Sequence, residues 1–338
     1  MASIIEVAKR AGVSQATVSR VLNNYPNVSK TAEVKVKQAM EDLGYRPAAR
    51  RQGHRSGLQY GTFALLILDY DVYQHYSPAF VKLLTSVESA CTEQGLNIII
   101  AQSLDAQQLP PLVQNKQVDG LILAGQSAAP AVLKKIASLP AVWVSSHHED
   151  SGDTALPGND AAGRLAAQYL LNRGHKHLAV VNALPNHLGL QSRTEFFEFT
   201  AQRNNATVAA INAPVENLTT LDDLDLNAIE AAMTVAVDKL LAQKNKPTGF
   251  FTLIDIFTAI MHRILIRKGL KPGKDIDLIG CNNNKAALAG LYPRPATIRI
   301  GIDTMGKRAV EQLLWRISNP NEKENVHVVV EPQLIPGD

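Results

Sequence analysis

The first 45 residues carry the signals of two short helices joined by a glycine turn. Ser3 and Glu6 form a capping box, in which the Ser3 hydroxyl accepts the Glu6 amide hydrogen and the Glu6 carboxylate accepts that of Ser3. An apolar stripe at helical spacing runs to Ala11, and Gly12 follows, a residue that readily takes the left-handed conformation that ends a helix. Ser14 is placed to cap a second helix. Together these signals predict a helix-turn-helix fold.

The second helix presents a face suited to reading DNA. Val18, Val21 and Leu22 share its inward face, which leaves outside a set of small or polar side chains and one guanidinium: Gln15, Ala16, Thr17, Ser19 and Arg20. Such a helix fits the major groove with its amino-terminal residues against base edges. There Gln15 would pair with adenine and Ala16 would contact a thymine methyl, while the hydroxyls and Arg20 would hold phosphates or a guanine.

A third helix is expected to begin at Ser29, to bury Val36, Met40 and Leu43, and to stop at Gly44, with Tyr45 packing over the bundle. Residues 1–60 hold ten Lys and Arg and four acidic residues, a net charge of +6; the whole chain carries +3, which leaves −3 on the remainder. A basic head on a mildly acidic body fits binding to a phosphate backbone. A generic three-helix cap with a solvated basic surface is the weaker alternative, because caps, turn, stripe and charge agree.

Cysteine use and hydropathy exclude several other classes. Cys91 and Cys281 lie far apart, without the spacing of a zinc site or a disulfide framework, so we expect reduced thiols, no metal and no cofactor. The first residues lack a basic segment followed by an apolar one, and no apolar run approaches 18 residues. These features predict a cytoplasmic protein without a membrane partner.

From Thr62 onward, short apolar strands alternate with amphipathic helices, which predicts parallel sheets covered on both faces. We expect strands at 63–68, 97–101, 118–123, 141–145, 177–182, 249–254, 277–280 and 326–330, and helices near 78–94, 129–138, 160–173, 189–203, 228–243, 256–268 and 303–318. About 280 residues of this pattern exceed one small doubly wound domain. The expected fold class is therefore an all-α head followed by a two-lobed α/β body with two doubly wound parallel sheets.

The head resembles that of lactose-repressor-type (LacI/GalR) regulators. The resemblance rests on residues 5–23, IEVAKRAGVSQATVSRVLN, on Val28-Ser29-Lys30-Thr31 and on Leu43-Gly44-Tyr45-Arg46-Pro47. It implies that Gln15, Ala16 and Arg20 read bases, and that Thr17, Ser19 and Asn23 hold the DNA backbone. Ser14, at the start of the same helix, joins this set of DNA-binding candidates. The implied domains are a head at 1–46, a basic hinge at 47–59 and a body at 60–338.

The hinge departs from the family pattern. In the family, a short helix folds on operator DNA and wedges a leucine into the minor groove. Here His54 stands in the leucine's place and Gly53 weakens the helix before it. Two interpretations remain open: Arg50, Arg51, Arg55 and His54 enter a narrow minor groove, or they form a flexible basic linker that touches only phosphates.

The body resembles periplasmic sugar-binding proteins, whose two lobes close on a small molecule. We expect lobe 1 at about 60–158 and 286–318, lobe 2 at about 159–285 and 319–338, and a first-lobe helix trimmed between Ala101 and Val118. The resemblance implies a homodimer on a palindromic operator and an effector, a sugar or related metabolite, bound between the lobes. The candidate effector residues are Arg193, Asp255 and Asn282, with Asp69, Tyr73 and Ser77 as weaker candidates. Asn282 and Asn283 replace the family's usual aspartate pair, and an amide donates as well as accepts.

Catalytic motifs are missing from the sequence: it contains no GxxxxGK[ST], GxSxG, HExxH or strand-linked GxGxxG pattern. The run His147-His148-Glu149-Asp150 lies in a polar loop and is a weak metal candidate. The alternatives of a transport-like binding module or a sugar kinase conflict with the DNA-reading head and the missing phosphate loop. The sequence therefore predicts a non-enzymatic, sequence-specific transcription regulator, a dimeric repressor whose operator affinity is set by a small molecule.

Overall fold

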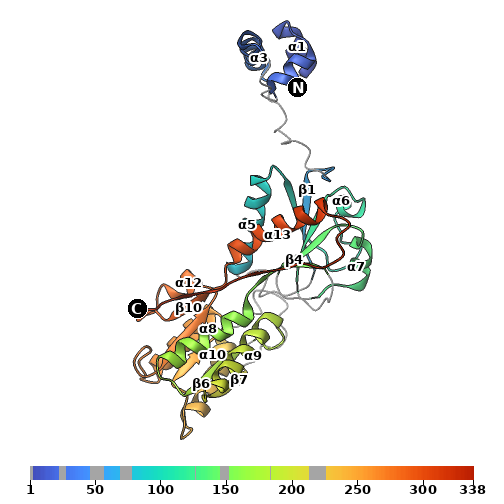
Figure 1. Ribbon diagram of the computed structural model, residues 1–338. Coiled ribbons are helices and arrows are strands. Elements are labelled where there is room, and N and C mark those ends of the chain that lie inside the picture. Colours follow the sequence, from blue (N-terminus) through green and yellow to red (C-terminus); the bar gives the residue numbers. More distant parts are fainter. Residues whose placement is uncertain are drawn as a thin grey trace. The chain divides into compact units, whose positions relative to one another are not determined.

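The computed structural model describes residues 3–22, 28–45, 57–68, 78–125, 127–144, 152–182, 184–212 and 226–338, apart from the side chains of Ser19 and Leu22. The chain divides into two compact units, residues 1–54 and residues 55–338. The described part of the first unit holds three helices, α1 (Ile4–Ala11), α2 (Gln15–Leu22) and α3 (Lys30–Asp42) (Figure 1). The second unit is an α/β body. The predicted fold class is confirmed.

Local signals set the ends of the head's helices as the sequence predicted. The Ser3 amide donates to Glu6 Oε2 over 2.7 Å, and the Glu6 amide donates to Ser3 Oγ over 3.3 Å, which completes the capping box. Gly12 has a φ of 64°, the left-handed conformation expected for the turn. The Thr17 amide donates to Ser14 Oγ over 3.1 Å and so caps α2.

A small apolar core holds the three helices together. Its buried members come from all three: Val7, Ala8, Ala11, Val18, Val21, Val36 and Ala39. Met40, Leu43 and Tyr45 pack against this core but are only partly buried, so they close the bundle at its rim. An ion pair between Arg10 Nη2 and Asp42 Oδ2, 2.8 Å apart, joins α1 to α3.

The body contains two six-stranded sheets, one in each lobe (Figure 1). The lobe 1 sheet has the order β11-β5-β4-β3-β1-β2, all parallel: β1 (Thr62–Ile67), β2 (Asn97–Gln102), β3 (Gly120–Ala124), β4 (Ala141–Val144), β5 (Asp153–Pro157) and β11 (His327–Val330). The lobe 2 sheet has the order β12-β10-β9-β8-β6-β7: β6 (His177–Asn182), β7 (Thr207–Asn212), β8 (Gly249–Phe251), β9 (Asp277–Cys281), β10 (Ala296–Arg299) and β12 (Gln333–Ile335). Only β12 runs antiparallel among the described strands.

Helices cover the sheets. Lobe 1 carries α5 (Pro78–Glu93), α6 (Pro111–Gln114), α7 (Pro130–Ile136) and α13 (Ile302–Ser318); lobe 2 carries α8 (Asn159–Asn172), α9 (Leu188–Arg203), α10 (Leu226–Leu241), α11 (Asp255–Arg267) and α12 (Lys285–Leu288). One apolar cluster forms where α5 and α13 pack on the lobe 1 sheet and a second forms on its α6–α7 side, while the lobe 2 core is a single larger cluster. The four-residue α6 matches the trimmed helix expected between Ala101 and Val118. Within the described ranges, no helix is both long and apolar enough to cross a membrane.

The lobe assignment of the last third of the chain was wrong in two segments. β10, expected in lobe 1, pairs with β9 in lobe 2 (Ala296 beside Ile279), and β11, expected in lobe 2, pairs with β5 in lobe 1 (Val328 beside Ala155). The chain therefore returns to lobe 1 after β10 rather than before it. The lobe 1 sheet therefore includes β11 as an edge strand. The short helix α12 contacts α11 in lobe 2.

Three chain passages connect the lobes, after β5, after β10 and after β11, and they lie side by side. The Gly158 amide donates to the Val330 carbonyl over 3.0 Å. Gly301 has a φ of 63°, and a Cβ at this position would lie 2.6 Å from Val330 Cγ1. These contacts place the start of α13 directly at the passage between the lobes.

Candidate DNA-reading face and candidate effector site

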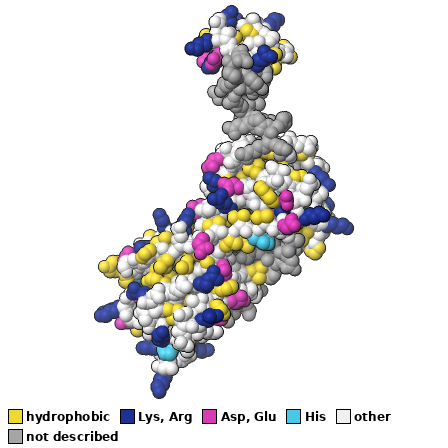
Figure 2. Space-filling model, viewed as in Figure 1, with side chains coloured by type: hydrophobic (Ala, Val, Ile, Leu, Met, Phe, Trp, Pro, Cys, Tyr) yellow, Lys and Arg dark blue, Asp and Glu magenta, His cyan; other side chains and the backbone are white. Residues whose placement is uncertain are grey.

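The outward face of α2 exposes three of the five side chains that the sequence placed there. Gln15, Ala16 and Arg20 are exposed, and Thr17 is half-buried. Ser14 Oγ and Thr17 Oγ1 lie 2.9 Å apart and bond to each other, and Ser14 Oγ also accepts the Thr17 amide at the helix start. Lys and Arg side chains lie on several sides of the head (Figure 2).

The remaining DNA-binding candidates fall outside the described part of the chain. These are the Ser19 side chain, Asn23, Arg50, Arg51 and His54, together with most of the predicted hinge at 47–59. Their roles stay predictions, as does the choice between a groove-entering hinge and a flexible basic linker.

In lobe 2, three polar candidates follow three neighbouring strands. Arg193 lies on α9 after β6, Asp255 begins α11 after β8, and Asn282 follows β9 directly. β6, β8 and β9 are adjacent and parallel, so their carboxyl ends lie on one edge of the sheet. In open α/β sheets this edge, near the point where the strand order reverses, is where ligands bind.

Asp255 is held in place by two donors. The Thr297 hydroxyl donates to Oδ1 over 2.6 Å, and the Asn284 amide donates to Oδ2 over 2.5 Å. The residue is only 1% exposed. Burial raises its pKa to about 7, although the two hydrogen bonds and the charge of Arg193 act in the opposite direction. The group is therefore divided between its neutral and ionised forms near neutral pH.

Arg193 is 4% exposed and is fixed by two bonds to neighbouring elements. Its Nε donates to Asn159 Oδ1 over 2.9 Å, and its Nη1 donates to the Leu253 carbonyl over 2.7 Å. These two bonds use Nε and Nη1, and no further hydrogen bond of the guanidinium is found within the described part of the chain. The helix carrying Arg193 approaches α8 closely, because Gly163 leaves room: a Cβ there would lie 2.3 Å from the Arg193 carbonyl oxygen.

Asn282 and Asn283 form a strained turn after β9, with φ values of 94° and 50°. The Asn282 amide donates to the Ile298 carbonyl over 2.8 Å, which fixes its backbone between β9 and β10. Its Oδ1 atom is buried and has no hydrogen-bond partner among the described residues. Buried polar atoms are normally paired, so this oxygen is an exception to that rule.

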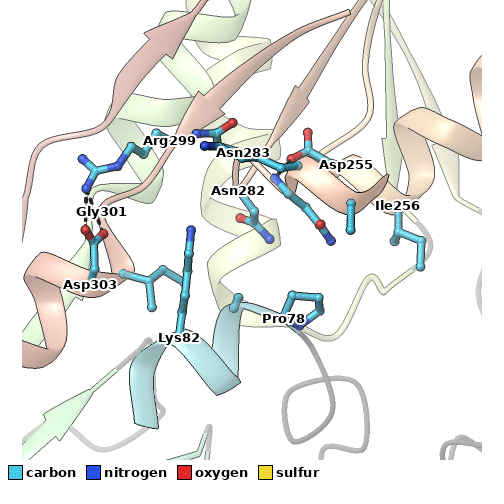
Figure 3. Close-up of a pocket in the computed structure, with 14 residues that line it drawn as sticks. Pro78, Lys82, Asp255, Ile256, Asn282, Asn283, Arg299, Gly301 and Asp303 are labelled. Atoms are coloured by element: carbon cyan, nitrogen blue, oxygen red, sulfur yellow. Dashed lines mark hydrogen bonds and ion pairs between the residues drawn. The ribbon is translucent and has the colours of Figure 1, made fainter. Parts of the chain in front are cut away.

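Asp255 and Asn282 line a cleft of about 250 Å³ between the lobes (Figure 3). Lobe 1 contributes Pro78, Ala79 and Lys82 from α5 and residues 301–303 at the start of α13; lobe 2 contributes Ile256, residues 283–286 and Arg299. Sequence reasoning missed Lys82, Lys285, Arg299 and Asp303, because nothing in the local pattern marks them. Arg193 is not part of the cleft lining, although it lies close enough to influence the pKa of Asp255.

Three weaker effector candidates, Asp69, Tyr73 and Ser77, lie in 69–77, outside the described residues. The polar run His147–Asp150 lies outside them as well. Among the described residues, lobe 1 therefore contributes to the candidate site from α5 and from the start of α13.

Family models match almost the whole chain. The model of bacterial regulatory proteins of the lacI family matches residues 3–48. The periplasmic binding protein-like domain matches residues 167–338, about half of the chain, and the model of periplasmic binding proteins and sugar binding domains of the lacI family matches residues 65–205.

Curated relatives align over the full length. The ribose operon repressor of Haemophilus influenzae is 28% identical, with 99% of this chain and 97% of that protein covered. The transcriptional repressor PurR of Aliivibrio fischeri gives the same identity and coverage.

Solved structures share the fold at lower identity. The lac repressor dimer bound to operator and the anti-inducer ONPF aligns with a TM-score of 0.71 at 21% identity, covering 99% of this chain and 98% of that one. The complex of the transcriptional regulator CelR with cellobiose aligns with a TM-score of 0.66 at 21% identity, covering 100% of this chain and 99% of that one. With the family models matched along both units, this chain belongs to the lacI family of bacterial regulatory proteins.

Proposed function

We propose that this protein is a DNA-binding transcription repressor, not an enzyme, whose affinity for its operator is set by a small molecule bound between the lobes. The observation that carries the proposal is the exposed face of α2, where Gln15, Ala16 and Arg20 follow a capped helix start. The helix presents to solvent the donors, acceptors and methyl group that read base edges in the major groove. Ser14, Thr17, Ser19 and Asn23 contact the DNA backbone in this proposal.

Two copies act together. A head of this size reads one half-site, and a palindromic operator requires a homodimer, as in the lac repressor dimer bound to operator. Arg50, Arg51 and His54 approach the minor groove between the half-sites. The repressor works in the cytoplasm, where the DNA and the metabolite are both available.

The effector binds at the carboxyl edge of the lobe 2 sheet. Arg193, Asp255 and Asn282 contact it from lobe 2, and Asp69, Tyr73 and Ser77 complete the site from lobe 1. CelR, a structural neighbour, was solved with cellobiose, and the ribose operon repressor is a sequence relative, so a sugar or sugar derivative fits the proposed site.

The test begins with DNA selected from a random duplex pool by the full-length protein. The selected duplex and a scrambled version are compared by fluorescence anisotropy at rising salt. A repressor binds the selected duplex at least about 1,000-fold more tightly, and this ratio survives at physiological salt. Equal binding to both duplexes, lost steeply in salt, would contradict the proposal.

A pair of variants locates the reading face. Arg20→Ala is expected to weaken binding by about 1–3 kcal/mol and to relax preference at one base pair in each half-site. Lys37→Ala is the matched control, since Lys37 is exposed on α3 and, among the described residues, forms its ion pair with Glu33, 2.7 Å away. The control is expected to leave sequence preference unchanged.

A further inference from the structure

The chain enters lobe 1 from the head through residues 57–62, and several contacts of the body hold this stretch. We propose that Asp119 and the carboxyl end of α13 form a joint that couples the head to the body, so that operator binding by the head changes the surroundings of α13. Asp119 acts at this joint as a positioning residue. The inference rests on the proposed function, because it requires specific binding to an operator.

The Asp119 carboxylate binds three backbone amides of this stretch. Its Oδ1 accepts the Gln59 amide over 2.5 Å and the Tyr60 amide over 2.9 Å, and its Oδ2 accepts the Thr62 amide over 3.0 Å. The residue is 9% exposed. Hydrogen bonds to a carboxylate are stronger than those between neutral groups, and a buried carboxylate that loses them keeps its full desolvation penalty. Asp119 therefore fixes the path of the backbone directly before β1.

The same stretch packs against the carboxyl end of α13. Gly57 has a φ of 105°, and a Cβ at this position would lie 3.0 Å from both Cγ2 and the carbonyl oxygen of Ile317. Leu58 packs against the apolar cluster that contains Ile317. The start of β3, directly after Asp119, approaches this helix too: a Cβ at Gly120 would lie 2.8 Å from Leu313 Cδ1. Both sides of the joint thus meet on the last two turns of α13.

The carboxyl end of α13 is tied to the lobe 1 sheet. Arg316 donates to both oxygens of Asp153, from Nε over 2.8 Å and from Nη2 over 2.5 Å. Gln312 Nε2 donates to the same carboxylate over 2.8 Å. Because Asp153 is the first residue of β5, these bonds make the helix move together with the sheet.

The other end of α13 lies at the passage between the lobes. Residues 301–303 line the inter-lobe cleft, and the helix runs from there across lobe 1 toward the side where β1 begins (Figure 1). Its 17 residues span about 25 Å at about 1.5 Å per residue. A rotation of lobe 1 by about 10° around the passage would displace the joint by up to about 4 Å. The arrangement of the lobes and the position of residues 57–62 are therefore coupled, and such coupling acts in both directions.

Trp315 is a natural probe of this joint. It lies two residues before Ile317, it is 40% exposed, and Arg316 Cζ lies 5.2 Å from the centre of its ring. The chain has one other tryptophan, Trp143, which is buried on the α6–α7 side of the lobe 1 sheet, and the head has none. In Trp143→Phe, indole emission therefore reports on the carboxyl end of α13 alone.

The experiment titrates full-length Trp143→Phe with the selected operator duplex, while the anisotropy of the labelled duplex measures binding. We expect Trp315 emission to change in step with saturation by the operator and to stay constant with the scrambled duplex. Asp119→Asn in the same background replaces one acceptor oxygen by an amide group that donates, so it faces backbone donors. This variant should lose the emission change while it still binds the operator.

Gly57→Ala tests the joint from the linker side, at an exposed residue. Its Cβ would press on Ile317, and a positive φ disfavours alanine, so residues 57–58 must move away from α13 and the emission change should again be lost. Gly95→Ala is the matched control, because Gly95 is exposed, has a φ of 70° and has nothing within 4 Å of its Cβ position. The control should respond like Trp143→Phe alone. Urea unfolding verifies that each variant is folded.

Two outcomes would overturn the inference: saturation with operator that leaves Trp315 emission unchanged, or an emission change in Asp119→Asn and Gly57→Ala equal to that of the control. Specific operator binding, measured by anisotropy, would keep the proposed function in both cases. A folded variant that no longer distinguishes the two duplexes would support the joint, since neither substitution lies in the head. If the protein without these two substitutions fails to distinguish the duplexes, the proposed function and the inference fall together.

Discussion

Lobe 1 and lobe 2 share the strand order of a doubly wound sheet but use their buried carboxylates differently. The order β2-β1-β3-β4-β5 in lobe 1 corresponds to β7-β6-β8-β9-β10 in lobe 2. In lobe 1, Asp119 and Asp153 lie at the amino ends of β3 and β5. Asp119 accepts the amides of residues 59, 60 and 62, and Asp153 accepts Arg316, Gln312 and the Val326 amide.

Lobe 2 has one buried aspartate at the amino end of a strand and another just past the carboxyl end of the neighbouring strand. Asp277, at the amino end of β9, bonds to Arg173 and His175. Burial alone would raise the pKa of Asp153 and Asp277, but their cationic and hydrogen-bonding partners hold both below the ordinary value. Asp255, at the carboxyl end, has a raised pKa instead. The difference teaches that amino-end carboxylates hold the framework, while the carboxyl-end carboxylate stands where ligands bind.

The largest expected effect is the removal of a framework carboxylate in lobe 1. Asp153→Ala leaves Arg316, which is only 15% exposed, without its partner, and should lower the free energy of unfolding by about 3–5 kcal/mol. Urea unfolding of the full-length protein measures this. Asp277→Ala in lobe 2 should cost less, because its partner Arg173 is 47% exposed and can be hydrated. Equal losses would show that partner exposure does not control the energy of these pairs.

The head was predictable from sequence because its determinants are local. The capping box, the Gly12 turn and the Ser14 cap each involve residues within three positions of one another. Arg193, Asp255 and Asn282 could also be found, because each follows a recognisable strand or lies on the helix after one.

The rest of the body depends on contacts between distant segments. β10 and β11 are four residues each, and only their pairing partners reveal which lobe they join. β5, β7, β10 and β12 were missed as strands. β7, TVAAIN, contains two alanines and an asparagine, which are depleted in strands, and lies at a sheet edge. The cleft residues Lys82, Lys285 and Arg299 come from three separated stretches, so no local spacing could group them.

A middle-sized effect is expected where lobe 2 positions Arg193. In Gly163→Ala, the new Cβ would lie 2.3 Å from the Arg193 carbonyl oxygen and 2.9 Å from the Phe197 amide nitrogen, so α9 must move away from α8. Overpacking of this kind costs roughly 1–3 kcal/mol, and the shift of α9 should also weaken effector binding. Urea unfolding and ligand-induced thermal shifts measure the two effects.

Gly290→Ala provides the control for that variant. Nothing lies within 4 Å of a Cβ at Gly290, which is exposed. The expected change in stability is within about 0.5 kcal/mol. If Gly163→Ala behaved like this control, the close approach of α8 and α9 would not be what holds Arg193 in place.

The smallest expected effect is a pH dependence from Asp255. Its pKa of about 7 in the folded protein exceeds the ordinary value of 3.8, so between these values the folded state holds a proton that the unfolded chain has released. Stability therefore falls as pH rises through this window, by on the order of 1 kcal/mol between pH 6 and 8. In Asp255→Asn this contribution is absent.

The difference in unfolding free energy between wild type and Asp255→Asn, measured by urea at pH 6, 7 and 8, isolates the group, since other titrating residues are common to both proteins. The substitution also alters the bond from the Asn284 amide, but that change is independent of pH and shifts the difference without changing its slope. We expect the unfolding free energy of the wild type to fall relative to that of Asp255→Asn as pH rises. Parallel curves would mean that Asp255 is ionised throughout this pH range. The carboxyl end of the lobe 2 sheet would then stabilise an ionised carboxylate, as the amino ends do for Asp153 and Asp277.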